Sequence, residues 1–281
     1  GDGGMEGLCR AAEHNRRMPF FSRTWGLLRS LAIYHGIPWR AAQLRRFYAP
    51  VVPAGGLAFD VGAHAGNRVR AFRALGARVV AVEPQPDFVA LLSRWFARDA
   101  GVTVLPVALG REAGQAQLLA SEATPTVSTL SADWAQRAGA TASFQGVRWS
   151  PGPVVPVTTL DALIAQHGRP DFIKIDVEGF ELEVLQGLGQ PVPALSFEFL
   201  APVRDLALGC IDRLEALGRY RYQWSVGEQL RLQPGVALDA DAMRAWLRGL
   251  ADDAPSGDIL ARLDGEAGTQ AGGLSAAAIK G

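Results

Sequence analysis

Cysteine is scarce in this chain, and its two cysteines lie far apart. Cys9 and Cys210 are the only ones among the 281 residues. Such a pair has neither the close spacing of a zinc site nor the pattern of a disulfide framework. The sequence therefore indicates neither kind of cross-link. A reducing compartment is compatible with this, and we expect a cytoplasmic protein.

Net charge and long apolar runs are also missing. The 28 Lys and Arg residues balance the 28 Asp and Glu residues, so the formal net charge is zero. Phosphate-binding surfaces are basic, and this balance argues against nucleic acid as the main partner. No apolar run approaches the ~20 residues that a membrane-spanning helix needs, and we expect no transmembrane segment.

The remaining composition is that of an ordinary globular protein, with 48% hydrophobic and 20% charged residues. We expect an N-terminal helical extension at residues 1–50, a main domain at 51–264 and a flexible Gly/Ala-rich tail at 265–281. Amphipathic helices in the extension could form a lid over a ligand or a homodimer contact. The alternative is a solvated helix face beside a buried stripe.

Two apolar segments that each lead into a carboxylate are the most informative feature. The first runs through Phe59 into Asp60 and a turn of small residues that contains Gly62 and Gly66; the second ends at Glu83. A strand, a glycine turn, a helix and a strand ending in an acid are typical of a nucleoside-binding βαβ unit. The glycines permit positive φ or close approach of the backbone to a ligand, and Glu83 could accept hydrogen bonds from a ribose diol.

This turn differs from the dinucleotide fingerprint. His64 stands where the second glycine of that pattern would fall, and Asp60 just before the turn is unfavourable for a diphosphate. An acid there suits a ligand with an ammonium group, such as the methionine moiety of S-adenosylmethionine. Two alternatives stay open, namely a purely structural strand–helix turn and an NAD-dependent dehydrogenase.

Further blocks in the same order extend the pattern over about residues 55–200. With them the chain resembles the FkbM family of S-adenosylmethionine-dependent methyltransferases. The most specific block is Lys174-Ile-Asp-Val-Glu-Gly179; the others are Asp60–Gly66, Val82–Pro84, Val107–Gly110, Ser128–Leu130, Thr159–Asp161 and Glu181–Leu185. The resemblance implies an α/β class I methyltransferase (Rossmann-like) fold. Such a fold has a mainly parallel seven-stranded sheet with helices on both faces, here with the N-terminal helical extension added.

The resemblance also implies S-adenosylmethionine as the cofactor. The residues predicted to bind it are Asp60, Gly62, Ala63, His64, Gly66, Glu83, Gln85, Val107 and Ala108. An imidazole can act as a general base near neutral pH. Family members, however, often carry Asn at the position of His64, so we interpret His64 as a pocket residue.

Three carboxylates are the candidate catalytic residues. Asp176 ends the fourth predicted strand, Glu178 follows two residues later, and Glu198 comes from the fifth strand. They could act as a base, orient a hydroxyl group or hold a divalent cation. The sequence lacks the Asp-Asn pair by which small-molecule O-methyltransferases bind magnesium, and we assign no metal ligand. Alternatively, Glu198 is the structural partner of Lys174 or of an arginine.

By resemblance, the methyl acceptor is a hydroxyl oxygen of a sugar, a glycolipid or a polyketide-type natural product. The alternative is a non-catalytic module that binds a nucleoside and regulates a partner.

We further expect a third strand over residues 102–110, an insertion at 111–157 with a short strand at 115–119, and a hairpin that joins 220–226 to 229–232 through Gly227. The insertion either carries substrate contacts or is a mobile surface loop.

Overall fold

The computed structural model describes residues 38–121, 127–141, 147–233, 235 and 237–265. Of the predicted N-terminal extension, the described part contains one helix, α3 (Pro38–Tyr48). Residues 1–37 lie outside the described part, and so does nearly all of the predicted tail. The dimer contact predicted through the N-terminal helices therefore stays a prediction.

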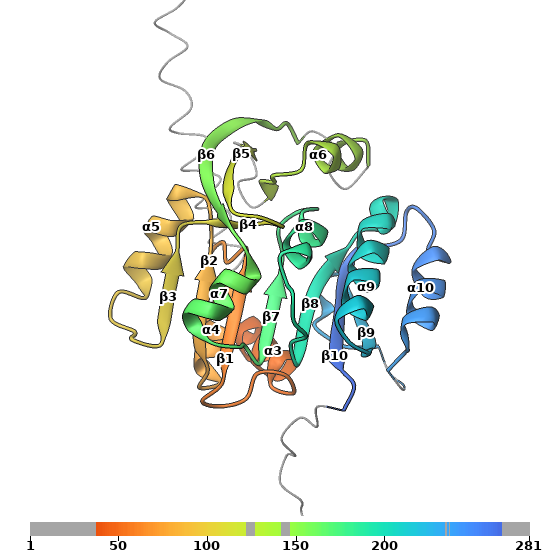
Figure 1. Ribbon diagram of the computed structural model, residues 1–281, viewed down its shortest axis with the longest axis horizontal. Coiled ribbons are helices and arrows are strands. Elements are labelled where there is room, and N and C mark those ends of the chain that lie inside the picture. The colour runs from red at the N-terminus through yellow and green to blue at the C-terminus, as the bar shows by residue number, and fades with distance from the viewer. Residues whose placement is uncertain (1–37, 122–126, 142–146, 234, 236, 266–281) are drawn as a thin grey trace, which may run out of the picture.

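A seven-stranded sheet forms the centre of the domain (Figure 1), in the order β3-β2-β1-β7-β8-β10-β9. β10 is antiparallel to both of its neighbours, and the other pairs are parallel. This order is that of the class I methyltransferase fold, as predicted. The strands are β1 (Leu57–Val61), β2 (Arg78–Val82), β3 (Val102–Leu105), β7 (Phe172–Ile175), β8 (Ala194–Phe199), β9 (Tyr220–Val226) and β10 (Gly257–Leu263).

Helices cover both faces of the sheet because successive strand residues point to opposite sides. On one face, Ala58 of β1 packs with α3, α4 (Asn67–Ala74) and α5 (Pro86–Trp95). On the other face, Phe59 of β1 packs in the core formed with α7 (Leu160–His167), α8 (Glu181–Gln186), α9 (Arg204–Leu217) and α10 (Ala240–Arg248). The strands therefore read as continuous apolar runs, as expected for a buried parallel sheet.

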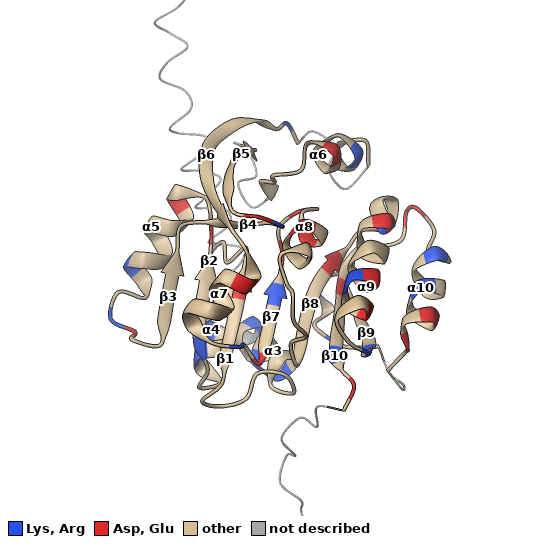
Figure 2. Ribbon diagram, in the orientation of Figure 1, with Lys and Arg blue, Asp and Glu red and all other residues tan. Residues whose placement is uncertain are grey.

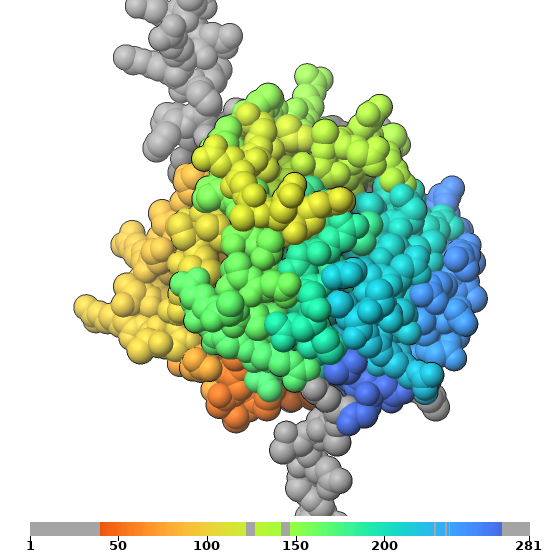
Figure 3. All heavy atoms as spheres, in the orientation of Figure 1, coloured from red at the N-terminus to blue at the C-terminus, as the bar shows by residue number. Residues whose placement is uncertain are grey.

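A second, three-stranded sheet caps the domain. It contains β4 (Ala108–Leu109), β5 (Gly114–Ala120) and β6 (Ser150–Thr158) in the order β4-β6-β5. With α6 (Ala132–Gly139) it lies over the carboxyl ends of the central strands (Figure 1). The space-filling view shows this segment covering one end of the molecule (Figure 3). We call β4, β5, β6, α6 and residues 127–131 the cap.

Two sequence predictions need correction here. The third strand ends at Leu105, and Ala108–Leu109 belongs to the cap because it pairs with β6. The strand predicted at 115–119 is confirmed as part of β5. The predicted hairpin is wrong, since β9 pairs with β10 and a short 3₁₀ turn, η4 (Gly227–Gln229), follows β9. β9 pairs with β10 on one edge, and its other edge meets the chain farther on than predicted, at Gln233 and Leu238. Leu230 and Leu232 pack against the core without forming a strand.

Charged residues of both signs lie on the outer helices α9 and α10 (Figure 2), in keeping with the zero net charge. Among the described residues, no helix has the length and apolar content needed to cross a membrane. The predicted cytoplasmic location stays a prediction.

Candidate active site

Two adjoining cavities lie at the carboxyl ends of the central strands. The larger has a volume of about 220 Å³ and the smaller about 30 Å³. His64 and Asp176 line both of them, so the cavities meet at the turn after β1 and the end of β7. This is the edge of an open α/β sheet at which ligands bind.

The smaller cavity collects most of the predicted cofactor residues. Its wall includes Gly62, His64, Glu83, Gln85, Val107 and Ala108, and the cap closes it with Ser128, Thr129 and Leu130. The Glu83 carboxylate accepts hydrogen bonds from the backbone N–H of His64 at 2.9 Å and of Gln85 at 2.8 Å. Burial raises the pKa of Glu83, although the His64 charge and these bonds oppose the rise. The bonds fix its carboxylate at the cavity wall.

The turn after β1 depends on left-handed backbone. Gly62 has φ +82°, His64 +46° and Gly66 +72°. A side chain on Gly62 would collide with the backbone carbonyl of Asp176, so this glycine brings the ends of β1 and β7 together. His64 tolerates its conformation better than most residues, because His, Asn and Asp are enriched there.

Three of the predicted cofactor residues lie outside the smaller cavity. Ala63 lines the larger one, whereas Asp60 and Gly66 line neither. Gly66 instead lets the turn approach Leu92 of α5. Asp60 is fully buried on β1, and neither of its carboxylate oxygens has a hydrogen-bond partner among the described residues. Burial, opposed by the charge of Arg68, raises the pKa of Asp60 to about 7.

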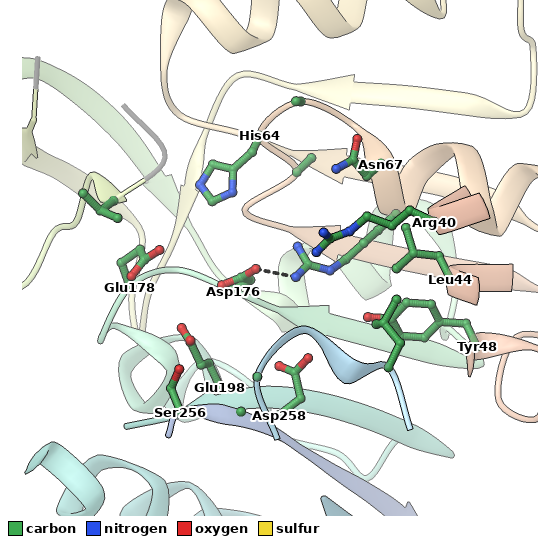
Figure 4. A pocket seen from close by; sticks show the side chains of 17 residues that line it. Arg40, Leu44, Tyr48, His64, Asn67, Asp176, Glu178, Glu198, Ser256 and Asp258 are labelled. Atoms are coloured by element: carbon green, nitrogen blue, oxygen red, sulfur yellow. Dashed lines mark ion pairs between the residues drawn. The ribbon is translucent and has the colours of Figure 1, made fainter. Parts of the chain in front are cut away.

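The three predicted catalytic carboxylates come together on one wall of the larger cavity (Figure 4). Asp176, Glu178 and Glu198 each place an oxygen within 4.8 Å of the others, close enough to contact one hydroxyl group or one divalent cation together. Arg68 of α4 pairs with Asp176 at 2.7 Å. Burial alone would raise the pKa of Asp176, but the charges of Arg68 and Lys174 outweigh it and hold that pKa below its usual range.

Glu178 and Glu198 have no ion pair with Arg68, and the charge of Lys174 lowers their pKa values by less than burial and the neighbouring acids raise them. Burial and the charges of Glu198 and Asp176 raise the pKa of Glu178 well above its ordinary value. Burial together with Asp176 and Asp258 does the same for Glu198. Neighbouring carboxylates resist being ionised together, so the pair favours one bound proton. The wall can then both donate and accept a hydrogen bond.

The segment that carries Glu178 is held from two sides. Glu178 has φ +52°, and its backbone carbonyl accepts a hydrogen bond from the Thr129 hydroxyl of the cap at 2.6 Å. On the other side, Glu181 accepts hydrogen bonds from the backbone N–H of Val177 and Gly179. These contacts maintain a backbone conformation that costs a non-glycine residue free energy.

Lys174 has a different partner from the one considered in the sequence. Its Nζ lies 2.5 Å from Asp258 of β10, and burial opposed by the charges of Asp258 and Asp176 leaves its pKa raised. Glu198 is therefore not the ion-pair partner of Lys174. Sequence analysis also missed Arg68, and Arg40 and Tyr48 of α3, which line the larger cavity. Arg68 comes two residues after Gly66 of the glycine turn, so the motif could have pointed to it. Asp258 and α3 lie outside the motif blocks, and no local pattern marks them as site residues.

Comparisons with known proteins agree with the sequence resemblance. The model of the family described as Methyltransferase FkbM domain matches residues 60–201, about half of the chain. A search of curated proteins found no match.

Three similar solved structures illustrate the structural neighbours. A TehB-like SAM-dependent methyltransferase from Corynebacterium glutamicum has 12% identity and a TM-score of 0.45, covering 87% of this chain and 99% of that one. A precorrin-6y C5,15-methyltransferase from Geobacter metallireducens has 11% identity, a TM-score of 0.40, and covers 79% and 86%. The corresponding values for a putative RNA methyltransferase from Pyrococcus horikoshii are 11%, 0.38, 79% and 82%. These identities are too low to transfer an acceptor.

Proposed function

The chain belongs to the FkbM family of S-adenosylmethionine-dependent methyltransferases, and we propose that it transfers the methyl group to a hydroxyl oxygen of a sugar, a glycolipid or a related natural product. The observation that carries this proposal is the convergence of Asp176, Glu178 and Glu198 on the larger cavity. Carboxylates at this spacing suit a polar, proton-bearing acceptor. They do not suit an apolar one.

The residues of the smaller cavity fit a nucleoside. Glu83 is fixed by two backbone hydrogen bonds, and each carboxylate oxygen has further capacity to accept a ribose hydroxyl. Gln85 and the backbone at Val107 and Ala108 would lie against the rest of the adenosine. The orphaned, buried carboxylate of Asp60 beneath the turn fits a cationic group of the ligand nearby. S-adenosylmethionine, when bound, supplies an electrophilic methyl group.

The acids of the larger cavity would position the acceptor and take its proton. A hydroxyl oxygen is a weak nucleophile until its proton can leave, and a neighbouring carboxylate can accept that proton. Glu178 and Glu198 are the candidates because neither makes an ion pair with a basic side chain among the described residues, whereas Arg68 occupies Asp176. The ion pair of Asp176 with Arg68 then holds the end of β7 against α4. His64 lies between the two cavities.

The test is methyl transfer to a panel of sugars and glycolipids by the full chain. We expect Glu178→Gln and Glu198→Gln each to lower kcat by about a hundredfold or more, in the range of general acid–base catalysis, while S-adenosylhomocysteine still binds. Glu183→Gln is the matched control, because Glu183 lies on α8 and pairs with Arg111 at the surface. It should transfer methyl groups as the wild type does.

Two outcomes would change this proposal. Binding of S-adenosylhomocysteine without transfer to any acceptor would favour the regulatory module. Transfer that requires magnesium and stops on chelation would instead make the three carboxylates a cation site, for which their 4.8 Å spacing is adequate. Family membership already argues against the dehydrogenase alternative.

A further inference from the structure

Helix α3 forms the wall of the larger cavity that faces the three acids. It precedes the family match at residues 60–201, so that match assigns it no role. Arg40, Leu44 and Tyr48 of α3 all line the cavity. They are spaced four residues apart and therefore share one face of the helix. The helix directs a hydroxyl group and a guanidinium toward the same space.

The packing of Tyr48 accounts for an aromatic ring at this position but not for the hydroxyl group on that ring. The ring lies edge-on to Phe72, with centroids 5.0 Å apart, and 5.5 Å from Phe172. The residue is 1% exposed, and its hydroxyl makes no hydrogen bond of good geometry among the described residues, although the Arg68 guanidinium and the Asp258 carboxylate lie close enough to act on it. The hydroxyl points into the cavity in Figure 4. A buried phenol normally finds a partner, since an unpaired polar group costs free energy.

Arg40 gives this wall its charge. Its side chain extends from α3 toward the centre of the cavity (Figure 4). Arg40 and Tyr48 stand two turns apart on α3, and a carboxylate lying between them could accept hydrogen bonds from both groups. The opposite wall carries Glu178 and Glu198, which would repel a negative group. Arg68 adds a second positive charge to this cavity and Asp258 a negative one near Tyr48, so an anion would be drawn toward the two arginines.

The two cavities meet at His64 and Asp176, and α3 lines only the larger one. A ligand whose ribose lies at Glu83 leaves the smaller cavity past His64, and it then enters the larger cavity between the turn and α3. The group of S-adenosylmethionine beyond its ribose and sulfur is an α-amino acid, which ends in a carboxylate. The chemistry of the α3 wall matches that end of the molecule.

We propose that α3 binds the carboxylate of the cofactor's amino-acid end through the Tyr48 hydroxyl and the Arg40 guanidinium. This inference rests on the proposed function, because it places the nucleoside in the smaller cavity. It makes an element outside the family match part of the cofactor site. It also assigns a function to α3, which is to contact the cofactor on the side of the glycine turn that faces the larger cavity.

The test compares two ligands that differ only in that carboxylate. S-adenosylmethionine and decarboxylated S-adenosylmethionine are titrated by calorimetry into the full wild-type chain and into Tyr48→Phe and Arg40→Gln. A hydrogen bond to a charged group typically contributes enough for about a tenfold change in Kd or more. We expect each variant to weaken S-adenosylmethionine about tenfold and to leave the decarboxylated ligand unchanged.

Arg45→Gln is the matched control, since Arg45 is an exposed residue of the same helix and the change in charge is identical. It should bind both ligands as the wild type does. Unchanged binding of the decarboxylated ligand shows that a variant is folded. Equal wild-type affinity for the two ligands, or variants that bind S-adenosylmethionine normally, would overturn the inference alone. A wild-type chain that binds neither ligand would overturn the cofactor assignment, and the inference with it.

Discussion

At the scale of single residues, Asp60 is a buried acid whose carboxylate lacks the hydrogen bonds that buried polar groups normally make. Its carboxylate is buried, and neither oxygen has a partner among the described residues. Arg68 and Lys174 favour the charged form, while Asp176 and Glu83 oppose it. A stable fold that retains such a group stores unfavourable free energy at that position, which is typical of functional sites.

Asp60 should therefore make stability depend on pH. Its pKa is raised from 3.8 to about 7, so between these values the folded chain holds a proton that the unfolded chain has lost. Stability is then lost as the pH rises through this window. Asp60→Asn should be up to about 4 kcal/mol more stable than the wild type at about pH 8, and should match it near pH 4.

Urea unfolding at the two pH values measures this difference. Asp253→Asn, at an exposed turn, is the control and should change the free energy of unfolding little at either pH. A stability gain for Asp60→Asn that is equal at both pH values would contradict the interpretation, because it would not come from titration.

At the scale of elements, the cap and the Glu178 segment form one unit. Trp134 of α6 occupies the space where a side chain on Gly179 would stand, and Gly179 has φ +85°. Trp134 is fully buried and packs with Trp149 of the segment before β6 and with Val203. Packing of α6 against this turn therefore fixes how the cap lies over the carboxyl ends of the strands.

Gly179→Ala should destabilise the domain much more than a glycine substitution of equal backbone cost. Gly55 has a similar φ of +77°, but a side chain there would meet nothing within 4 Å. Gly55→Ala should cost roughly 1–2 kcal/mol for its conformation alone. Gly179→Ala should cost at least about 2 kcal/mol more, because the cap must move. Thermal unfolding of both variants gives the comparison. Equal losses of stability would show that Trp134 moves aside without a cost in free energy.

Thr129 connects the cap to the proposed base. Thr129→Val removes the donor to the Glu178 carbonyl and should lower kcat about tenfold, a larger effect than any change in the Kd of S-adenosylhomocysteine that follows from its place in the smaller cavity. Thr129→Ser keeps the hydroxyl and should restore most of the rate. If serine is as slow as valine, then the methyl group rather than the hydrogen bond is what matters.

At the scale of the whole molecule, segments far apart in the sequence complete the central sheet and pair its buried charges. β10 comes from the end of the described chain and inserts between β8 and β9. It places Asp258 beside the fully buried Lys174 of β7, a pair joined across the sheet. Such a pair contributes little net free energy when intact, but its rupture leaves a charge in the core.

A double-mutant cycle should show this coupling. Asp258→Asn should cost about 3–5 kcal/mol, and Lys174→Met with Asp258→Asn should cost clearly less than the sum of the single changes. The exposed pair of Arg221 and Asp264 is the comparison, and Asp264→Asn should cost no more than about 1 kcal/mol. Denaturant titration measures all of these variants, and additive losses would mean that Lys174 is stabilised by other groups.

The sequence by itself determined the βαβ unit, the family and the candidate acids. These follow from local patterns, because an apolar strand, a glycine turn and a terminal carboxylate are fixed within a few residues of one another. Asp176, Glu178 and Glu198 were predicted to converge since parallel strands end at one edge of a sheet, and the structure brings them within 4.8 Å.

Only the tertiary structure decided which distant groups meet. β9 pairs with β10 on one edge and meets Leu238 rather than residues 229–232 on the other, and Ala108–Leu109 belongs to the cap rather than to the third strand. The partner of Lys174 and the position of α3 over the larger cavity also appear only in three dimensions. Local patterns state which faces must be buried and which charges must be paired. The competition among all available partners in the folded core decides where each of them goes.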